Sequence, residues 1–145
     1  MTAAMSCSDT TSRECRCPCG TVHPLHLCCG RYLDGSAQAP TAEALMRSRY
    51  TAYHLRNEAY LLATWHASTR PAGLQIAHGS APGEPAIQWI GLEVKRAQPT
   101  GASSAIVEFV ARHKTGGRAQ RMHEVSRFVC EDGRWFYVGA EMPSL

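Results

Sequence analysis

Residues 104–140 decide the fold, and they read SAIVEFVARHKTGGRAQRMHEVSRFVCEDGRWFYVGA. Within this stretch, runs of alternating apolar and polar residues have the period of half-buried β-strands, and they span residues 104–113, 119–130 and 134–140. Gly116-Gly117 predicts a turn between the first two runs, and Asp132-Gly133 predicts a tight hairpin between the last two. The stretch therefore predicts three consecutive antiparallel strands.

The residues before this stretch predict one more strand and two helices. Residues 88–97 form the first strand, with Ile90, Leu92 and Val94 expected on one face and Trp89 on the other. Apolar residues at helical spacing predict a helix from the N-cap Thr41 to about residue 57, and a shorter helix follows over residues 58–66. Helices followed by an antiparallel meander indicate an α+β fold with the helices on one face of the sheet.

Composition narrows the class of protein further. The chain has 145 residues, of which 44% are hydrophobic and 19% charged, as in an ordinary globular domain with a small appendage. No apolar stretch is long enough for a transmembrane helix, and residues 1–14 lack the basic start and apolar centre of a secretory signal. The net charge of +3 is too small to call for a nucleic-acid partner. These features predict a cytoplasmic protein without a membrane role.

Cysteine spacing gives the most specific chemical signal. Six of the seven cysteines fall in the first fifth of the chain, and their core reads Cys17-Pro18-Cys19-Gly20 and, after a gap, Cys28-Cys29-Gly30. Clustered cysteines in a reducing compartment indicate metal or redox chemistry. The glycines allow the positive φ with which backbone amides can point back at sulfur. Two closely spaced pairs suit a closed four-thiolate shell, which predicts structural zinc on Cys17, Cys19, Cys28 and Cys29.

Other interpretations of the cysteines stay open at this point. A disulfide between Cys28 and Cys29 would join residues whose Cα atoms are about 3.8 Å apart, which is below the usual disulfide range. A redox-active Cys-x-Cys pair is a second alternative. Cys15 could also replace a neighbour as a ligand, and His23 and His26 are near in sequence, although the four-cysteine set needs neither.

The stretch from Cys17 to Gly30 resembles the SEC-C motif, the small zinc-binding tail module of the SecA translocation ATPase. In that family the four matching cysteine positions are the zinc ligands. The middle of the module usually reads Ser-Gly-Lys-Lys-Tyr, whereas residues 21–25 read Thr-Val-His-Pro-Leu. This departure leaves the expected zinc site intact, but the partner contacts of the module are not carried over.

Several later stretches are similar to the YchJ-like family of bacterial proteins, whose cellular role is largely uncharacterised. They are APTAEALMRSRY at 39–50, TWH at 64–66, QWIGL at 88–92 and WFYVG at 135–139, and the resemblance covers about residues 15–140. It implies a nuclear-transport-factor-like (NTF2-like), or cystatin-like, cone, in which a curved antiparallel sheet wraps a helix around a pocket. The implied organisation is a disordered tail (1–14), a SEC-C-type zinc finger (15–33), a linker (34–40) and an NTF2-like α+β domain (41–145). We expect the domain to fold without the finger, and the finger to need zinc.

Four residues are candidates for the pocket of the cone: Trp65 and His66 at a helix end, Trp89 on the first strand and Glu124 on the third. A carboxylate can orient an imidazole, so His66 and Glu124 would form an acid–base pair if the cone were an enzyme. The alternative interpretation is structural. Mixed charges on antiparallel strands are typical of a solvated face with cross-strand ion pairs, and a helix-terminal Trp-His is typical of core packing.

The sequence therefore favours a non-enzymatic interaction or ligand-binding protein with a structural four-cysteine zinc. The alternative is a small enzyme that uses the cone pocket, with His66 and Glu124 as its acid–base pair. The expected partner is a protein or a small ligand, and a homodimer follows only by analogy with other cones. Nucleic acid is not expected, because the arginines have little aromatic interleaving.

Overall fold

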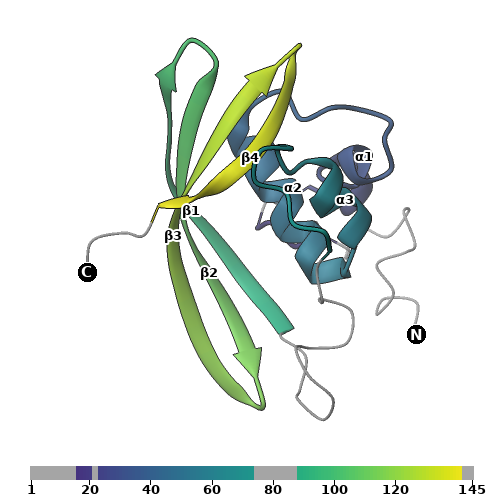
Figure 1. The fold of residues 1–145 in the computed structure, drawn as a ribbon. Helices are drawn as coiled ribbons and strands as arrows, with labels where there is room; N and C mark the ends of the chain where they lie inside the picture. The colour runs from purple at the N-terminus through teal and green to yellow at the C-terminus, as the bar shows by residue number, and fades with distance from the viewer. Residues whose placement is uncertain (1–15, 21–22, 74–87, 142–145) are drawn as a thin grey trace.

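The chain is described by a computed structural model over residues 16–20, 23–73 and 88–141. In chain order these residues form η2 (Leu25–Leu27), α1 (Gly30–Leu33), α2 (Ala42–Leu55), α3 (Glu58–Ala63), β1 (Gln88–Gly101), β2 (Ser104–Thr115), β3 (Arg118–Glu131) and β4 (Arg134–Glu141). The helices lie on one side of the sheet (Figure 1). The predicted disordered tail falls outside the described residues. Within the described ranges, no helix is both long and apolar enough to cross a membrane.

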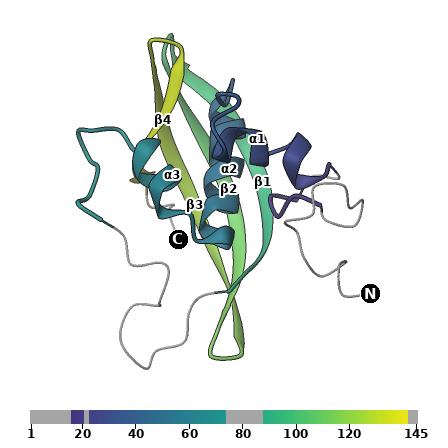
Figure 2. The same ribbon diagram turned by 90° about the vertical axis from the view of Figure 1, so that its right-hand side faces the viewer.

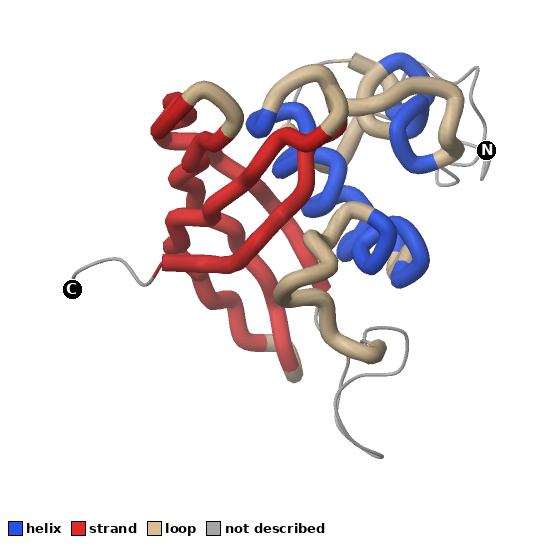
Figure 3. Tube along the Cα trace, turned by 45° about the horizontal axis from the view of Figure 1, so that its top comes forward, coloured by secondary structure: helices blue, strands red, loops and turns tan. Residues whose placement is uncertain are grey.

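The sheet is a meander in the order β1-β2-β3-β4, and every neighbouring pair is antiparallel. The chain reverses at Gly116-Gly117, with φ of 61° and 84°, and at Asp132-Gly133, with φ of 53° and 80°. Two-residue turns with positive φ at both positions match the twist of the strands that they join. Both predicted turns and all four predicted strands are confirmed. The sheet curves around the helices (Figure 3).

Local signals set the bounds of the helices. The Thr41 hydroxyl accepts a hydrogen bond from the Ala44 amide at 3.0 Å, so the predicted N-cap of α2 is confirmed. At its other end, Arg56 adopts a left-handed conformation with φ of 61° and stops the helix. The next helix, α3, is capped by the Asn57 side chain. Figure 2 looks onto the covered face of the sheet, with α2 and α3 in front of the strands.

The second predicted helix is shorter than expected and ends at Ala63. Trp65 and His66 leave the helix and pair with β4 instead. The His66 amide donates to the Tyr137 carbonyl at 2.7 Å, and the Tyr137 amide donates to the Thr64 carbonyl at 2.8 Å. This short parallel bridge satisfies backbone groups that another turn of helix would have used, and it fixes the end of α3 to the edge of the sheet.

The alternation predicted for the first strand is wrong at its beginning. The sequence placed Trp89 on the opposite face from Leu92 and Val94, but all three pack against the core. The cause is a β-bulge. Trp89 pairs with His113 and Gly91 pairs with Arg112, which leaves Ile90 without a partner in the ladder and 51% exposed. One extra residue reverses the phase of the alternation, so Trp89 turns inward.

The core runs without a break from the cysteine segment into the domain. Its buried members come from the N-terminal segment, from α2 and from the sheet, and they include Cys17, Cys19, Cys29, Tyr32, Leu45, Met46, Tyr50, Val107, Phe109 and Phe128. A Cβ added at Gly20 would lie 3.1 Å from the Leu92 carbonyl oxygen of β1, so the segment also touches the sheet closely. The domain boundaries stay a prediction, but the buried residues on either side of them form one core.

Candidate functional site

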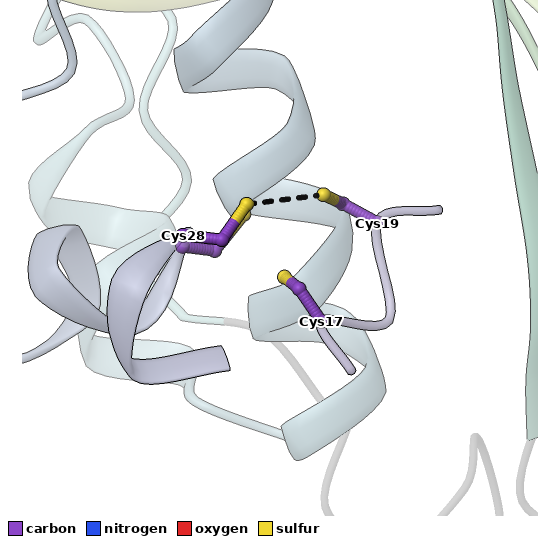
Figure 4. Close-up of side chains that lie close together, drawn as sticks. Cys17, Cys19 and Cys28 are labelled. Atoms are coloured by element: carbon purple, nitrogen blue, oxygen red, sulfur yellow. Dashed lines mark hydrogen bonds between the residues drawn. The ribbon is translucent and has the colours of Figure 1, made fainter. Parts of the chain in front are cut away.

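The four predicted ligand cysteines bring their sulfur atoms together. All four Sγ atoms lie within 4.8 Å of one another. The Cys19 and Cys28 sulfurs are 3.6 Å apart, and those of Cys28 and Cys29 are 4.0 Å apart. Figure 4 shows the side chains of Cys17, Cys19 and Cys28 converging. Sulfurs in a zinc tetrahedron with Zn–S bonds of about 2.3 Å are about 3.8 Å apart, so the cluster has the dimensions of a four-thiolate metal site.

Two short loops present these sulfurs. The Cys17 amide donates to the His23 carbonyl at 2.9 Å, which closes the first loop, and the Cys28 amide donates to the Leu25 carbonyl at 3.0 Å in the second. Gly20 has φ of 97°, as its place after the first pair predicted. Gly30 serves a different purpose from the one predicted. It begins α1, and an added Cβ would lie only 2.7 Å from the Leu25 carbonyl oxygen, so that position needs space rather than a positive φ.

Crowding and burial raise the pKa of two of the four thiols, Cys17 and Cys29. Three of the four cysteines are at most 3% exposed. The pKa of Cys17 is raised to about 11, chiefly by its hydrogen bond with the neighbouring Cys19 thiol and further by burial. The pKa of Cys29 is raised still more strongly by the thiols of Cys17 and Cys19, with burial adding to the effect. A divalent cation would reverse this effect, because it stabilises thiolates and displaces their protons.

The domain contributes directly to the surroundings of the cluster. Thr51 of α2 places its hydroxyl 3.5 Å from the Cys17 sulfur, and it is fully buried. Arg47, one turn earlier, donates from Nη1 to the Cys19 carbonyl at 2.8 Å and from Nε to Glu43 at 3.0 Å. From the other side, Arg31 donates to the Cys28 carbonyl at 3.1 Å. Two cations therefore lie where a four-thiolate site would carry negative charge.

The competing ligands are not part of this cluster. Among the described residues, the group of side chains that could hold a metal consists of the four cysteines alone, without His23 or His26. Cys15 lies outside the described residues, so its role as an alternative ligand stays open. Cys130 is on β3, where its amide donates to the Ser103 carbonyl at 2.8 Å.

A cavity of about 340 Å³ lies between α2 and the sheet. Two of the predicted pocket residues, Trp89 and Glu124, line it. Trp65 and His66 are not among its lining residues. The remaining walls come from α2, β2, β3 and β4, and they comprise Met46, Arg49, Tyr50, Tyr53, Phe109, Ala111, Met122, Ser126, Phe128 and Tyr137. Most of this surface is apolar or aromatic, as in pockets that hold small organic ligands.

Arg49 is a buried cation in the wall of this cavity. Its residue is 5% exposed, and burial lowers its pKa. The guanidinium carbon lies 4.3 Å from the ring centroid of Tyr137 and 5.0 Å from that of Trp65. Contacts of this kind stabilise a cation that has little water around it. Trp65 therefore supports the cavity indirectly, by stacking on one of its lining residues.

The predicted acid–base pair of His66 and Glu124 does not form. The Nε2 atom of His66 lies 2.8 Å from a Glu131 carboxylate oxygen, and its Nδ1 atom accepts from the Ser68 amide at 3.1 Å. Since the carboxylate only accepts, Nε2 carries the proton. Glu124 instead accepts from the Ser126 hydroxyl at 2.7 Å. His66 thus fastens the turn after α3 to the end of β3, which is the structural alternative.

Cross-strand ion pairs occur on the opposite face of the sheet, as that alternative predicted. Glu108 of β2 lies 2.7 Å from His123 of β3 and 3.2 Å from Arg96 of β1. The hydrogen bond with His123 is the main reason that the pKa of Glu108 is lowered. This face therefore carries solvated charge pairs, while Glu124 and Ser126 face the cavity.

A curved sheet that encloses a cavity with α2, and an N-terminal cluster of four cysteines, define an NTF2-like protein with a SEC-C-type metal motif. Residues 41–140 match the family described as "YchJ, middle NTF2-like domain". The chain belongs to the YchJ-like family, as its sequence motifs indicated.

Relatives and solved structures agree with this assignment. A UPF0225 protein of Chromobacterium violaceum is 58% identical over 125 residues, which cover 84% of this chain and 89% of the relative. A UPF0225 protein of Polaromonas naphthalenivorans is 48% identical over 141 residues, which cover 97% and 98%. The solution structure of a SEC-C motif containing protein from Rhodopseudomonas palustris has a TM-score of 0.77 at 32% identity, covering 88% of this chain and 98% of that chain. The crystal structure of another, from Psychrobacter arcticus, has a TM-score of 0.66 at 28% identity, covering 89% and 84%.

Sequence reasoning missed Arg49 as a cavity residue. The signal was present, because Arg49 lies at core spacing between Leu45, Met46 and Tyr50 on the apolar side of α2. An arginine in that position is either exposed at the edge of the stripe or buried with partners. The structure shows the second case. A charged residue at a core position of a helix is thus a signal that sequence analysis can use.

Proposed function

We propose that the chain is a non-catalytic binding protein in which a structural zinc holds the N-terminal segment on the domain. The observation that carries this proposal is the set of four Sγ atoms within 4.8 Å of one another, with three of the cysteines buried in the core. Zinc favours four thiolates in a closed tetrahedral shell, and such a shell leaves no position for a substrate. The metal would therefore stabilise the fold rather than take part in a reaction.

The cavity between α2 and the sheet is the proposed binding site. Its volume of about 340 Å³ lies within the usual range of ligand pockets, and its few polar groups stand among aromatic and apolar walls. A small ligand fits this surface better than a protein does, because the binding surface is concave. We also propose that the cysteine segment binds a protein partner and that the chain forms a homodimer through the sheet.

A reducing compartment, such as the cytoplasm, suits the proposed metal site. Zinc ligands have to stay thiolates, and the described cysteines are free of disulfides. Nucleic acid does not suit the arginines of α2. Arg49 is buried, and Arg47 is engaged with Glu43 and with the Cys19 carbonyl.

Elemental analysis of single cysteine variants tests the metal assignment. Wild-type protein should hold one zinc per chain, and Cys17→Ser should lose it. Cys130→Ser is the matched control, since it changes a cysteine outside the cluster and should keep the metal. If Cys15→Ser strips the zinc while Cys17→Ser retains it, the assignment is wrong.

Native mass spectrometry of the full chain, purified from its own cells, tests the binding role. The expected spectrum contains the chain with one zinc and a small molecule that is recovered unchanged. Ala111→Leu adds carbon atoms at a buried position in the cavity wall, so this variant should lose the small molecule and keep the zinc. Conversion of the small molecule by the wild-type protein would contradict the non-catalytic proposal.

A further inference from the structure

The cavity contains two opposite charges that do not neutralise each other directly. Arg49 enters it from α2, and Glu124 enters it from β3. Among the described residues, no ion pair joins the two side chains, although each is within electrostatic reach of the other. The Glu124 carboxylate makes its hydrogen bond to Ser126. The cavity thus presents a cation and an anion at separate points of its wall.

Arg49 uses only part of its guanidinium to stay in place. Its Nη1 atom donates to the Leu61 carbonyl and to the Thr64 hydroxyl, both at 2.8 Å. The planes of Tyr137 and Trp65 hold the group by cation–π contact. Within the described residues, Nε and Nη2 have no acceptor, so donors of a nearly buried guanidinium are left for a ligand. Among the described residues neither atom is a fully buried donor without a partner, so both keep access to the cavity, where a bound acceptor can replace water.

Glu124 is positioned in the same way. The Ser126 hydroxyl donates to its Oε2 atom at 2.7 Å, and Ser126 is 2% exposed. The Oε1 atom has no protein donor within the described residues. One carboxylate oxygen is therefore oriented by the sheet, and the other can accept a hydrogen bond from a ligand.

The rest of the cavity suits a flat or apolar body. Trp89 packs against Tyr50 and Tyr53, with ring centroids 5.9 Å apart in both pairs. Met46 and Met122 are part of the same lining. Aromatic rings favour flat groups, and methionine side chains adapt to irregular shapes.

We propose that this cavity binds an uncharged small molecule with an apolar or aromatic body and an amide-type polar end, whose carbonyl accepts from Arg49 and whose N–H donates to Glu124. This inference rests on the proposed binding role of the cavity. A ligand carboxylate would be attracted by Arg49 but repelled by Glu124. An ammonium or amidinium would be attracted by Glu124 but repelled by Arg49, so for either charged end the repulsion offsets the attraction. An amide pairs with both groups and carries no charge that has to leave water.

Three probes of nearly the same shape separate these cases: benzamide is neutral, benzoate is an anion and benzamidine is a cation. Each is titrated into the zinc-loaded full chain while ¹H–¹⁵N NMR follows the indole N–H of Trp89 and the backbone amide of Ser126. We expect benzamide to bind at least about tenfold more tightly than either charged probe, which is the ratio that corresponds to about 1.4 kcal/mol. Tighter binding of benzoate or of benzamidine would overturn the inference and leave the cavity as a binding site.

A matched pair of variants tests the part played by Glu124. Glu124→Gln removes the negative charge from the cavity, and Glu108→Gln removes the same charge from the opposite face of the sheet. We expect Glu124→Gln to strengthen benzoate binding several-fold relative to benzamide, while Glu108→Gln leaves the order of the probes unchanged. An unchanged order in Glu124→Gln would overturn the inference. If Glu124→Gln does not fold, the order of the three probes in the wild-type protein decides alone.

If none of the three probes shifts the Trp89 signal at about 10 mM, which is weak binding even for a fragment of this size, both the inference and the binding role of the cavity are wrong.

Discussion

The close approach of the cysteine segment to β1 makes Gly20 a sensitive position. Gly20→Ala forces a side chain onto a residue with φ of 97° and places a Cβ 3.1 Å from the Leu92 carbonyl oxygen. Positive φ costs an alanine about 1–2 kcal/mol, and overpacking against fixed backbone costs a further 1–3 kcal/mol. The Leu92 carbonyl belongs to a strand that is paired with β2, so it has little freedom to move away.

Gly35→Ala is the matched control for this substitution. Gly35 lies in the same N-terminal part of the chain and has a similar φ of 85°, but an added Cβ would meet nothing within 4 Å. The conformational cost and the change in the unfolded chain are shared by the two variants, so they cancel in the difference. The difference in free energy of unfolding should therefore be about 1–3 kcal/mol, the cost of the contact alone.

Thermal unfolding of the metal-saturated proteins measures this difference. For a chain of this length, 1 kcal/mol corresponds to about 2–4 °C in Tm. Gly20→Ala should melt at least about 3 °C below Gly35→Ala. Equal melting temperatures would mean that the cysteine segment does not lie against β1 in the way that the Gly20–Leu92 contact requires.

Four further predictions follow from the fold. Thr41→Ala removes the cap of α2 and should lower the free energy of unfolding, measured in urea, by about 1 kcal/mol. Thr41→Ser keeps a capping hydroxyl and should keep most of the stability that the cap provides. His66→Ala and Glu131→Ala should each lower Tm. The decrease in Tm of the double variant should be smaller than the sum of the two single decreases, since both residues belong to one hydrogen bond. A decrease equal to that sum would contradict this. NMR titration should place the pKa of Glu108 below its ordinary value, and His123→Ala should raise it. Because stability from a lowered carboxyl pKa is lost as pH falls through that pKa, His123→Ala should also make the protein less sensitive to acid. Removal of the metal with a chelator should lower the free energy of unfolding by about 2.7 kcal/mol relative to protein with free metal at a hundred times Kd, and unfolding should stay a single transition. Two separate transitions would argue against a common core.

Much of the architecture could be predicted because its signals are local. Gly116-Gly117 and Asp132-Gly133 predict the two turns, and Thr41 predicts the start of α2. The cysteine spacing identified the members of the cluster, because two loops with paired thiols have few other ways to satisfy a metal. The sequence also placed Glu124 on the third strand among the pocket candidates, and Glu124 lines the cavity.

The remaining features depend on contacts between residues far apart in the chain. His66 forms its hydrogen bond with Glu131, which is 65 residues away in the chain, only because the turn after α3 pairs with β4 at Tyr137. The bulge at Ile90 has no sequence signal of its own, yet it decides that Trp89 enters the cavity. The close packing of Gly20 on Leu92 likewise depends on how the segment lies against the sheet.

X-ray absorption at the zinc edge of the full chain reports the atoms that surround the metal, so it distinguishes a closed four-sulfur site from a mixed or open one. We expect a shell of four sulfur atoms at about 2.3 Å, without nitrogen or oxygen ligands. A mixed shell that includes histidine nitrogen, or a shell with a water oxygen in an open position, would contradict the assignment of a closed structural site to Cys17, Cys19, Cys28 and Cys29.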